Sequence, residues 1–283
     1  MLNLIRADLY RILRGKGFYI ATILLVSFIF AQTATNSTGG VVMSSGYTMV
    51  STYHDDGTIV NSYYSAKDDV YYDEIPKFTG SVAPFKMLEN ADVLLYFLLP
   101  FIVFVAAADF STNTVKNVLA NGMPRVKYYF AKLILACIFC LYVSLINIIV
   151  PVIAGTILHG FGGTFDMDFI LRLLRPFSAQ MVMLIGVTCV GLFLVFTTQK
   201  TSVINVSYIA FCLIPLLAIS FLMVATRKFE FLLDYEHVMN IRMLGEIDTA
   251  ETVAVIRAFA IGAFYILAST IGGIALFKRS EVK

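Results

Sequence analysis

The sequence predicts an all-α membrane protein with six membrane-crossing helices. Hydrophobic residues make up 59% of the 283 positions and charged residues only 14%, proportions far outside those of soluble domains. A helix needs about 20 mostly apolar residues to cross a bilayer, and six stretches qualify. The predicted crossings are residues 18–35, 91–108, 131–158, 177–198, 203–225 and 253–277. We therefore treat residues 1–283 as a single transmembrane domain.

The positions of Lys and Arg predict the orientation of these helices. With the N-terminus inside, the inner segments hold 12 basic residues and the outer segments hold 8. Cytoplasmic segments of membrane proteins carry the excess of Lys and Arg. Both termini are therefore expected in the cytoplasm. The net charge of +2 gives no reason to expect a nucleic-acid partner.

Residues 1–16 predict an amphipathic helix that lies on the membrane surface. Its apolar residues gather on one face of a helical wheel, and its basic residues occupy the rest. The apolar face consists of Leu2, Ile5, Leu9, Ile12 and Leu13. We assign Arg6, Arg11 and Arg14 to the membrane interface, where they would meet anionic lipid. A cleaved signal peptide is the alternative, because basic residues precede an apolar run.

Residues 36–90 form a large outer loop that is expected to fold as a small extracellular cap. Two β-prone runs, Met49–Tyr53 and Thr58–Tyr64, flank Asp56-Gly57, a pair typical of a tight hairpin turn. The acidic residues of the loop lack the spacing of a calcium-binding loop, so we interpret them as solvated surface. They are Asp55, Asp56, Asp68, Asp69, Asp73 and Glu74.

Two connections between the later helices also have sequences that predict local structure. Residues 166–175 predict a second interfacial helix, which is expected to end at Pro176. The turn at Gln199–Thr201 is short, so the fourth and fifth helices are expected to be antiparallel neighbours. The outer segment 226–252 is longer than a connection needs to be.

The segment 109–130, between the second and third helices, is expected to be a cytoplasmic loop that contains a short helix. Val115, Val118 and Leu119 recur at helical spacing and form an apolar face. Gly122 can supply the left-handed residue that ends a helix, and Pro124 suits the start of the next one. A short amphipathic helix at the inner membrane surface could be moved by another protein.

Three features of this segment carry a resemblance to a known family. Asp109 closes the second helix, Thr114 and Lys116 follow in a small polar cluster, and Arg125 and Lys127 precede the third helix. On these residues the chain resembles ABC-2-type transporter permeases, and the similarity extends over nearly the whole chain, including the N-terminal elbow helix. Asp stands where Glu is commoner in that family.

The resemblance implies a partner and a mechanism. Family members work as two permease chains, identical or homologous, with two separate ATPase chains that bind ATP and Mg²⁺. The ATPases would move the coupling loop 109–130. Two sets of residues are expected to couple the chain to the ATPase. The resemblance implicates Asp109, Thr114 and Lys116, and the helical periodicity adds the apolar face of Val115, Val118 and Leu119.

The resemblance further implies a cellular location and a class of substrate. The chain would cross the bacterial cytoplasmic membrane several times, with short re-entrant helices in the segment 226–252. Its substrate would be hydrophobic or amphipathic, and members of this size often export, or protect from, antimicrobial peptides and lipid-like toxins.

Motifs that would make the chain an enzyme are missing. The sequence contains no Gly-x-x-x-x-Gly-Lys-Ser/Thr loop for ATP and no His-Glu-x-x-His or Gly-x-Ser-x-Gly pattern. No cofactor or metal is expected in this chain. The interiors of the six predicted crossings also lack Asp, Glu and Lys, which disfavours a proton-coupled carrier. Arg257 is the exception, a candidate contact for substrate or lipid near the outer end of the sixth helix.

Two alternatives remain on the sequence alone. The chain could be a self-contained secondary carrier or channel, or it could be a non-transporting scaffold or sensor subunit. Dependence on a separate ATPase chain distinguishes the permease from both.

Overall fold

The fold is built from helices that are long and apolar enough to cross a membrane. The structure, a computed structural model, describes residues 1–37, 47–53, 59–65, 70–72, 78–226 and 229–279. Within these residues six such helical segments are present, which confirms the predicted number and a multi-pass membrane protein. The crossings are α2 (Lys16–Ser37), the broken helix from Ala91 to Ser111, α7 (Arg125–His159), α8 (Met167–Thr198), α9 (Thr201–Thr226) and α11 (Thr252–Arg279).

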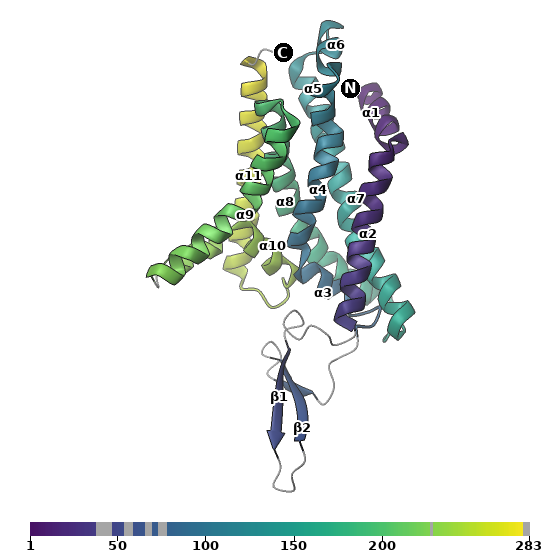
Figure 1. The fold of residues 1–283 in the computed structure, drawn as a ribbon, viewed down its shortest axis with the longest axis vertical. Coiled ribbons are helices and arrows are strands. Elements are labelled where there is room, and N and C mark those ends of the chain that lie inside the picture. Colours follow the sequence, from purple (N-terminus) through teal and green to yellow (C-terminus); the bar gives the residue numbers. More distant parts are fainter. Residues whose placement is uncertain (38–46, 54–58, 66–69, 73–77, 227–228, 280–283) are drawn as a thin grey trace.

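The two ends of the helical bundle differ in what they carry (Figure 1). One end, here called the coupling end, carries the N-terminal helix α1 (Leu2–Arg14), the short helix α6 (Thr114–Ala120) and the last turn of α11. The opposite end, here called the cap end, carries the strands and short helices α3 (Ala83–Glu89) and α10 (His237–Gly245). An even number of crossings accounts for α1 and the last turn of α11 lying at the same end.

The second crossing is not a single regular helix. It runs through η1 (Ala91–Val93), α4 (Leu94–Ile102), a π-helical turn η2 (Val103–Ala107) and α5 (Ala108–Ser111). A π-turn is an insertion into an α-helix and often occurs at functional sites. Phe104, in this turn, packs over Gly17 at the start of α2, where a Cβ would lie 3.0 Å from the ring.

Helices α8 and α11 pack against each other at glycines, and aromatic rings fill the core near the coupling end. A Cβ on Gly186 of α8 would lie 3.1 Å from the carbonyl oxygen of Gly262 in α11, so small residues permit this close approach. The ring of Phe196 lies 4.7 Å from that of Phe277 and 4.8 Å from that of Tyr129. These contacts fix α7, α8 and α11 as one packed unit.

The structure corrects two expected helix boundaries. Helix α8 begins at Met167 and continues through Pro176, whereas the sequence predicted that an interfacial helix ends at this proline. Proline removes one backbone donor, and helices in membranes tolerate that loss where neighbours pack around it; Pro176 is buried. Helix α7 begins at Arg125, so the coupling loop is shorter than residues 109–130.

The cap end combines a small sheet with short helices. Strands β1 (Tyr47–Tyr53), β2 (Ile59–Ser65) and β3 (Val70–Tyr72) pair antiparallel in that order. The first two coincide with the β-prone runs of the sequence. The acidic residues weighed as a calcium site, Asp55, Asp56, Asp68, Asp69, Asp73 and Glu74, lie outside the described residues.

A buried glutamine ties the short helices of the cap end to the bundle. The side-chain amide of Gln180 in α8 donates to the carbonyl oxygens of Leu88 at 2.7 Å and Ile241 at 2.8 Å. Leu88 belongs to α3 and Ile241 to α10, so one side chain holds both helices against α8. Before α10, the short 3₁₀ helix η3 (Glu230–Tyr235) follows α9.

Candidate functional site

A cluster of charged side chains lies inside the protein at the coupling end, where three helices meet. Asp8 and Arg11 are one turn apart on α1, Asp109 lies in α5, and Tyr128 and Lys132 are one turn apart on α7. Asp109, Tyr128 and Lys132 are fully buried, and Asp8 is nearly so. We call these five residues the charge cluster. Buried charges of this kind occur almost only when they are paired.

The carboxylates and bases of the charge cluster alternate in space. Lys132 Nζ lies 2.6 Å from Asp8 Oδ2 and 2.5 Å from Asp109 Oδ2. Arg11 bridges the same two carboxylates, with Nη2 3.2 Å from Asp8 Oδ1 and Nη1 2.5 Å from Asp109 Oδ1. The hydroxyl of Tyr128 donates to Asp109 Oδ2 at 2.6 Å. Each base therefore contacts both acids, and the four charges sum to zero.

The pKa values of Asp8 and Arg11 on α1 reflect their contacts within the charge cluster. Burial raises the pKa of Asp8, and the ammonium of Lys132 opposes that effect. Burial acts to lower the pKa of Arg11, but the Asp109 carboxylate outweighs it, so the pKa of Arg11 is raised. The Arg11 contact to Asp109 is close but is not aligned as a hydrogen bond, because Asp109 Oδ1 has no hydrogen-bond donor among the described residues. The N-terminal helix is thus held to the bundle by charge.

The three arginines of α1 lie in two different surroundings. Arg6 and Arg14 are exposed, as an interfacial role requires, and Arg14 donates to the hydroxyl of Tyr10. Arg11 instead turns toward Asp109 and is 39% exposed. The prediction that all three simply face lipid overlooked an acidic partner about 100 residues away.

The structure also corrects the expectation that no Lys or Asp lies inside a crossing. Lys132 lies two turns inside α7 and has no exposed surface, and Asp109 lies within the second crossing. The sequence placed both at the ends of apolar runs, where the solvent or the headgroups would reach them. Pairing with α1 removes that exposure.

The apolar face of α6 faces this protein rather than a partner. Val115 is fully buried in the hydrophobic core, and Val118 and Leu119 are half-buried against it. Because these residues already have neighbours in the chain, they do not form the free apolar face that the sequence suggested. The exposed residues of α6 are Lys116, Asn117 and Ala120.

The turns that flank α6 follow the sequence prediction. Gly122 has a φ of +86°, and Pro124 stands immediately before the first residue of α7. On the other side Asn113 adopts a left-handed φ of 56°, and the Thr112 hydroxyl lies 2.9 Å from that of Thr114. Two left-handed residues therefore turn α6 away from α5 and α7, so it projects from the coupling end (Figure 1).

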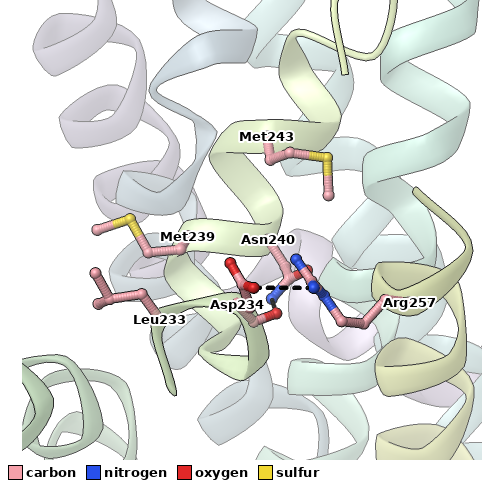
Figure 2. A pocket seen from close by; sticks show the side chains of 6 residues that line it. All are labelled: Leu233, Asp234, Met239, Asn240, Met243 and Arg257. Carbon is pink, nitrogen blue, oxygen red and sulfur yellow. Dashed lines mark hydrogen bonds and ion pairs between the residues drawn. The ribbon is translucent and has the colours of Figure 1, made fainter. Parts of the chain in front are cut away.

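Arg257 lies at the cap end, next to an open cavity of about 260 Å³. Figure 2 shows Asp234 and Arg257 pointing toward each other in the lining of this cavity, with Asn240 beside them. Arg257 Nη1 is 3.0 Å from Asp234 Oδ2. Leu233, Met239 and Met243 form the apolar part of the lining.

A second titratable pair lies buried beside this cavity in α10 and its cap. Glu236 accepts a hydrogen bond from the backbone N–H of Met239 at 2.9 Å, which caps α10. The His237 ring stacks on Phe211 of α9 at 4.8 Å. Burial raises the pKa of Glu236 and lowers the pKa of His237 to about 4, so His237 is neutral at physiological pH.

The interactions at these sites are ion pairs and hydrogen bonds between helices. Among the described residues no group of three His, Cys, Asp or Glu side chains could hold a metal ion. Asp8, Asp109, Tyr128 and Lys132 of the charge cluster are shielded from solvent, and only Arg11 reaches the surface. The geometry of the charge cluster can transmit a displacement of α6 to α5, α7 and α1.

One family comparison covers the middle of the chain. A family model described as ABC-2 family transporter protein matches residues 70–216, which is about half of the chain. The matched region begins at β3, contains Asp109, α6 and Lys132, and ends within α9. No curated protein is similar enough to the chain to match it.

Proposed function

The chain belongs to the ABC-2 transporter family, and on that premise we propose that it is the permease subunit of a bacterial ATP-binding cassette transporter. Two copies of a separate ATPase would drive it, and a second permease chain, identical or homologous, would complete the pathway. It would lie in the cytoplasmic membrane with both termini inside, and its cargo would be a hydrophobic or amphipathic compound, such as an antimicrobial peptide or a lipid-like toxin.

The observation that carries this proposal is the charge cluster behind α6. Asp109 lies five residues before α6, and Tyr128 lies eight residues after its last residue. Asp109 contacts Lys132 and Arg11 of α1, and Tyr128 donates to Asp109. A force on α6 would therefore act at once on the ends of two crossings and on the N-terminal helix. A loop that served only as a connector would not need buried charges behind it.

The surface that would meet the ATPase is the exposed face of α6. Lys116, Asn117 and Ala120 are exposed there, whereas Val115 is fully buried. The coupling role of Thr114, Val115, Val118 and Leu119 stays a proposal, and in it these residues anchor α6 to the permease. Lys116 would make the direct contact, and Asp109 would act from inside the charge cluster.

Co-purification with the ATPase tests the proposal. We expect Lys116→Glu combined with Asn117→Glu to abolish co-purification from detergent and to remove the ATPase activity that the permease supports. Both side chains are exposed, so expression and melting temperature should stay at wild-type values. Arg172→Glu, an exposed charge reversal at the cap end, is the matched control and should change neither readout.

Two outcomes would contradict the proposal. Wild-type co-purification and activity in the double variant would make α6 a plain connector. Transport by the chain alone in vesicles, lost when the proton gradient is collapsed, would favour a secondary carrier. A membrane scaffold or sensor would bind partners but move no substrate in vesicles supplied with the ATPase and ATP.

A further inference from the structure

Arg257 lines two cavities. The first is the cavity of Figure 2, formed with η3 and α10. The second, of about 390 Å³, is also lined by Arg257, together with Tyr235, Ala260, Ile261, Phe264 and Tyr265. A single charged group thus joins a pocket beside α10 to a groove on α11.

The second cavity follows one face of α11. Arg257, Ala260, Ile261, Phe264 and Tyr265 are spaced by three and four residues, so they share one helical face. Eight residues of helix extend over about 12 Å. The small side chain of Ala260 leaves space for the groove. The rings of Phe264 and Tyr265 line its continuation toward the middle of the membrane. The groove therefore has a polar end at Arg257 and an apolar length.

The polar end of the groove offers both signs of charge. Arg257 is paired with Asp234 at 3.0 Å, and their side chains are 28% and 50% exposed, so a ligand can reach both. The guanidinium also lies 5.6 Å from the centre of the Tyr235 ring. Its Nε is buried without a hydrogen-bond acceptor among the described residues, so the ion pair leaves part of this arginine unsatisfied.

We propose that this groove binds a lipid with a zwitterionic head group, one that carries a phosphate and an ammonium. The phosphate would pair with Arg257 and the ammonium with Asp234, while an acyl chain lies along the Ala260 and Phe264 face of α11. A purely anionic head group would meet the Asp234 carboxylate, and a purely cationic one would meet Arg257. The Tyr235 ring adds an attractive surface for an ammonium. This site does not depend on the proposed ATPase.

Lipid retained by the purified full-length chain tests the site. The protein would be equilibrated with mixed vesicles of phosphatidylethanolamine and phosphatidylglycerol, and the bound lipid would be counted by native mass spectrometry. We expect the wild-type chain to retain phosphatidylethanolamine about fivefold over phosphatidylglycerol. Equal retention of the two lipids would overturn the proposal.

Substitution of the acid should reverse the selectivity. Asp234→Asn removes the partner of the ammonium and leaves Arg257 free for phosphate, so the anionic lipid should now be preferred. Arg257→Gln should lose both lipids from the site. An unchanged ratio in Asp234→Asn would show that the pair only fastens η3 to α11.

A matched pair and a groove-filling variant complete the experiment. Arg175 and Asp248 form a similar pair at the cap end, 2.6 Å apart and more exposed, and this pair does not line the α11 groove. Arg175→Gln and Asp248→Asn should therefore leave the ratio of the two lipids at its wild-type value.

Ala260→Trp fills the groove without touching a charge and should lower retention of the zwitterionic lipid. Wild-type retention in Ala260→Trp would contradict a chain in the groove.

Competition with a soluble head group distinguishes binding of an intact lipid from binding of its polar part alone. Excess glycerophosphoethanolamine should fail to displace the bound lipid, because the α11 groove holds the acyl chain. Full displacement would overturn the assignment to an intact amphiphile. Melting temperatures within the wild-type range would show that each variant is folded.

Discussion

Ion pairs at the two ends of this protein differ in how exposed they are. At the coupling end Asp8, Asp109 and Lys132 are buried and fixed among three helices. At the cap end the pairs Arg257 with Asp234 and Arg175 with Asp248 keep much of their surface open. Buried charges with fixed partners are confined to one arrangement, whereas exposed charges remain available to a ligand. The difference predicts that equivalent substitutions have unequal effects at the two ends.

The largest effect is expected at Lys132. Lys132→Met leaves Asp8 and Asp109 with only Arg11 as a base, and removal of one partner from a buried ion pair costs about 3–5 kcal/mol of stability. The melting temperature in detergent measures it. Adding Asp8→Asn restores electrical neutrality and should recover part of the loss. A single variant as stable as wild type would show that the charge cluster is open to water.

Acid should destabilise the cap end through His237, and the sign follows from its pKa. The unfolded chain takes up a proton near pH 6.5, but the folded chain does so only near pH 4. The stability supported by neutral His237 is therefore present above pH 6.5 and is lost as the pH falls toward 4, a change on the order of 3 kcal/mol.

The raised pKa of Glu236 acts in the opposite direction, so wild type must be compared with a variant that keeps this carboxyl. His237→Gln does not titrate, and its melting temperature should fall less than that of wild type between pH 7 and pH 4.5. Parallel pH profiles in the two proteins would place His237 in contact with water.

A smaller effect is expected at Tyr128. Tyr128→Phe keeps the ring but removes the hydrogen bond to Asp109, and a hydrogen bond to a charged group contributes about 1.5–3 kcal/mol. The melting temperature should fall by less than in Lys132→Met. The same change at Tyr10, whose hydroxyl accepts from exposed Arg14, is the control and should have little effect. Equal losses in the two variants would remove the distinction between closed and open polar contacts.

The smallest effect is expected at Arg175. Its contact with Asp248 is short, but both side chains are more than half exposed, and such surface pairs contribute about 0–1 kcal/mol. Arg175→Gln should leave the melting temperature nearly unchanged at low and at high salt. A loss as large as that of Lys132→Met would contradict the comparison between the two ends.

The sequence alone predicted the crossings but not the charge cluster, for a physical reason. Six apolar runs are local signals, because each helix satisfies its own backbone. The partners of Lys132 are distant in the sequence, 124 positions away at Asp8 and 23 at Asp109. A base beside an apolar run has the same pattern whether it faces lipid headgroups or a buried acid.

For a related reason, the sequence could not predict where the apolar face of α6 packs. Periodicity correctly grouped Val115, Val118 and Leu119 on one face. It does not state whether that face packs on the same chain or on another one. Only the packing of α6 against the end of the bundle decides it. The Arg257 groove shows the same limit, since its Tyr235 wall comes from a segment that the sequence could describe only by its length.

The π-turn of the second crossing sets the direction in which Asp109 points. A π-turn holds one residue more than an α-turn, so every side chain beyond it is rotated by about 100° relative to an uninterrupted helix. Asp109 follows Val103–Ala107 by two residues. Deleting any one residue of this turn would restore a regular helix and swing Asp109 away from Arg11 and Lys132. The neutrality of the charge cluster therefore depends on how many residues precede Asp109 in this crossing, as well as on which residues they are.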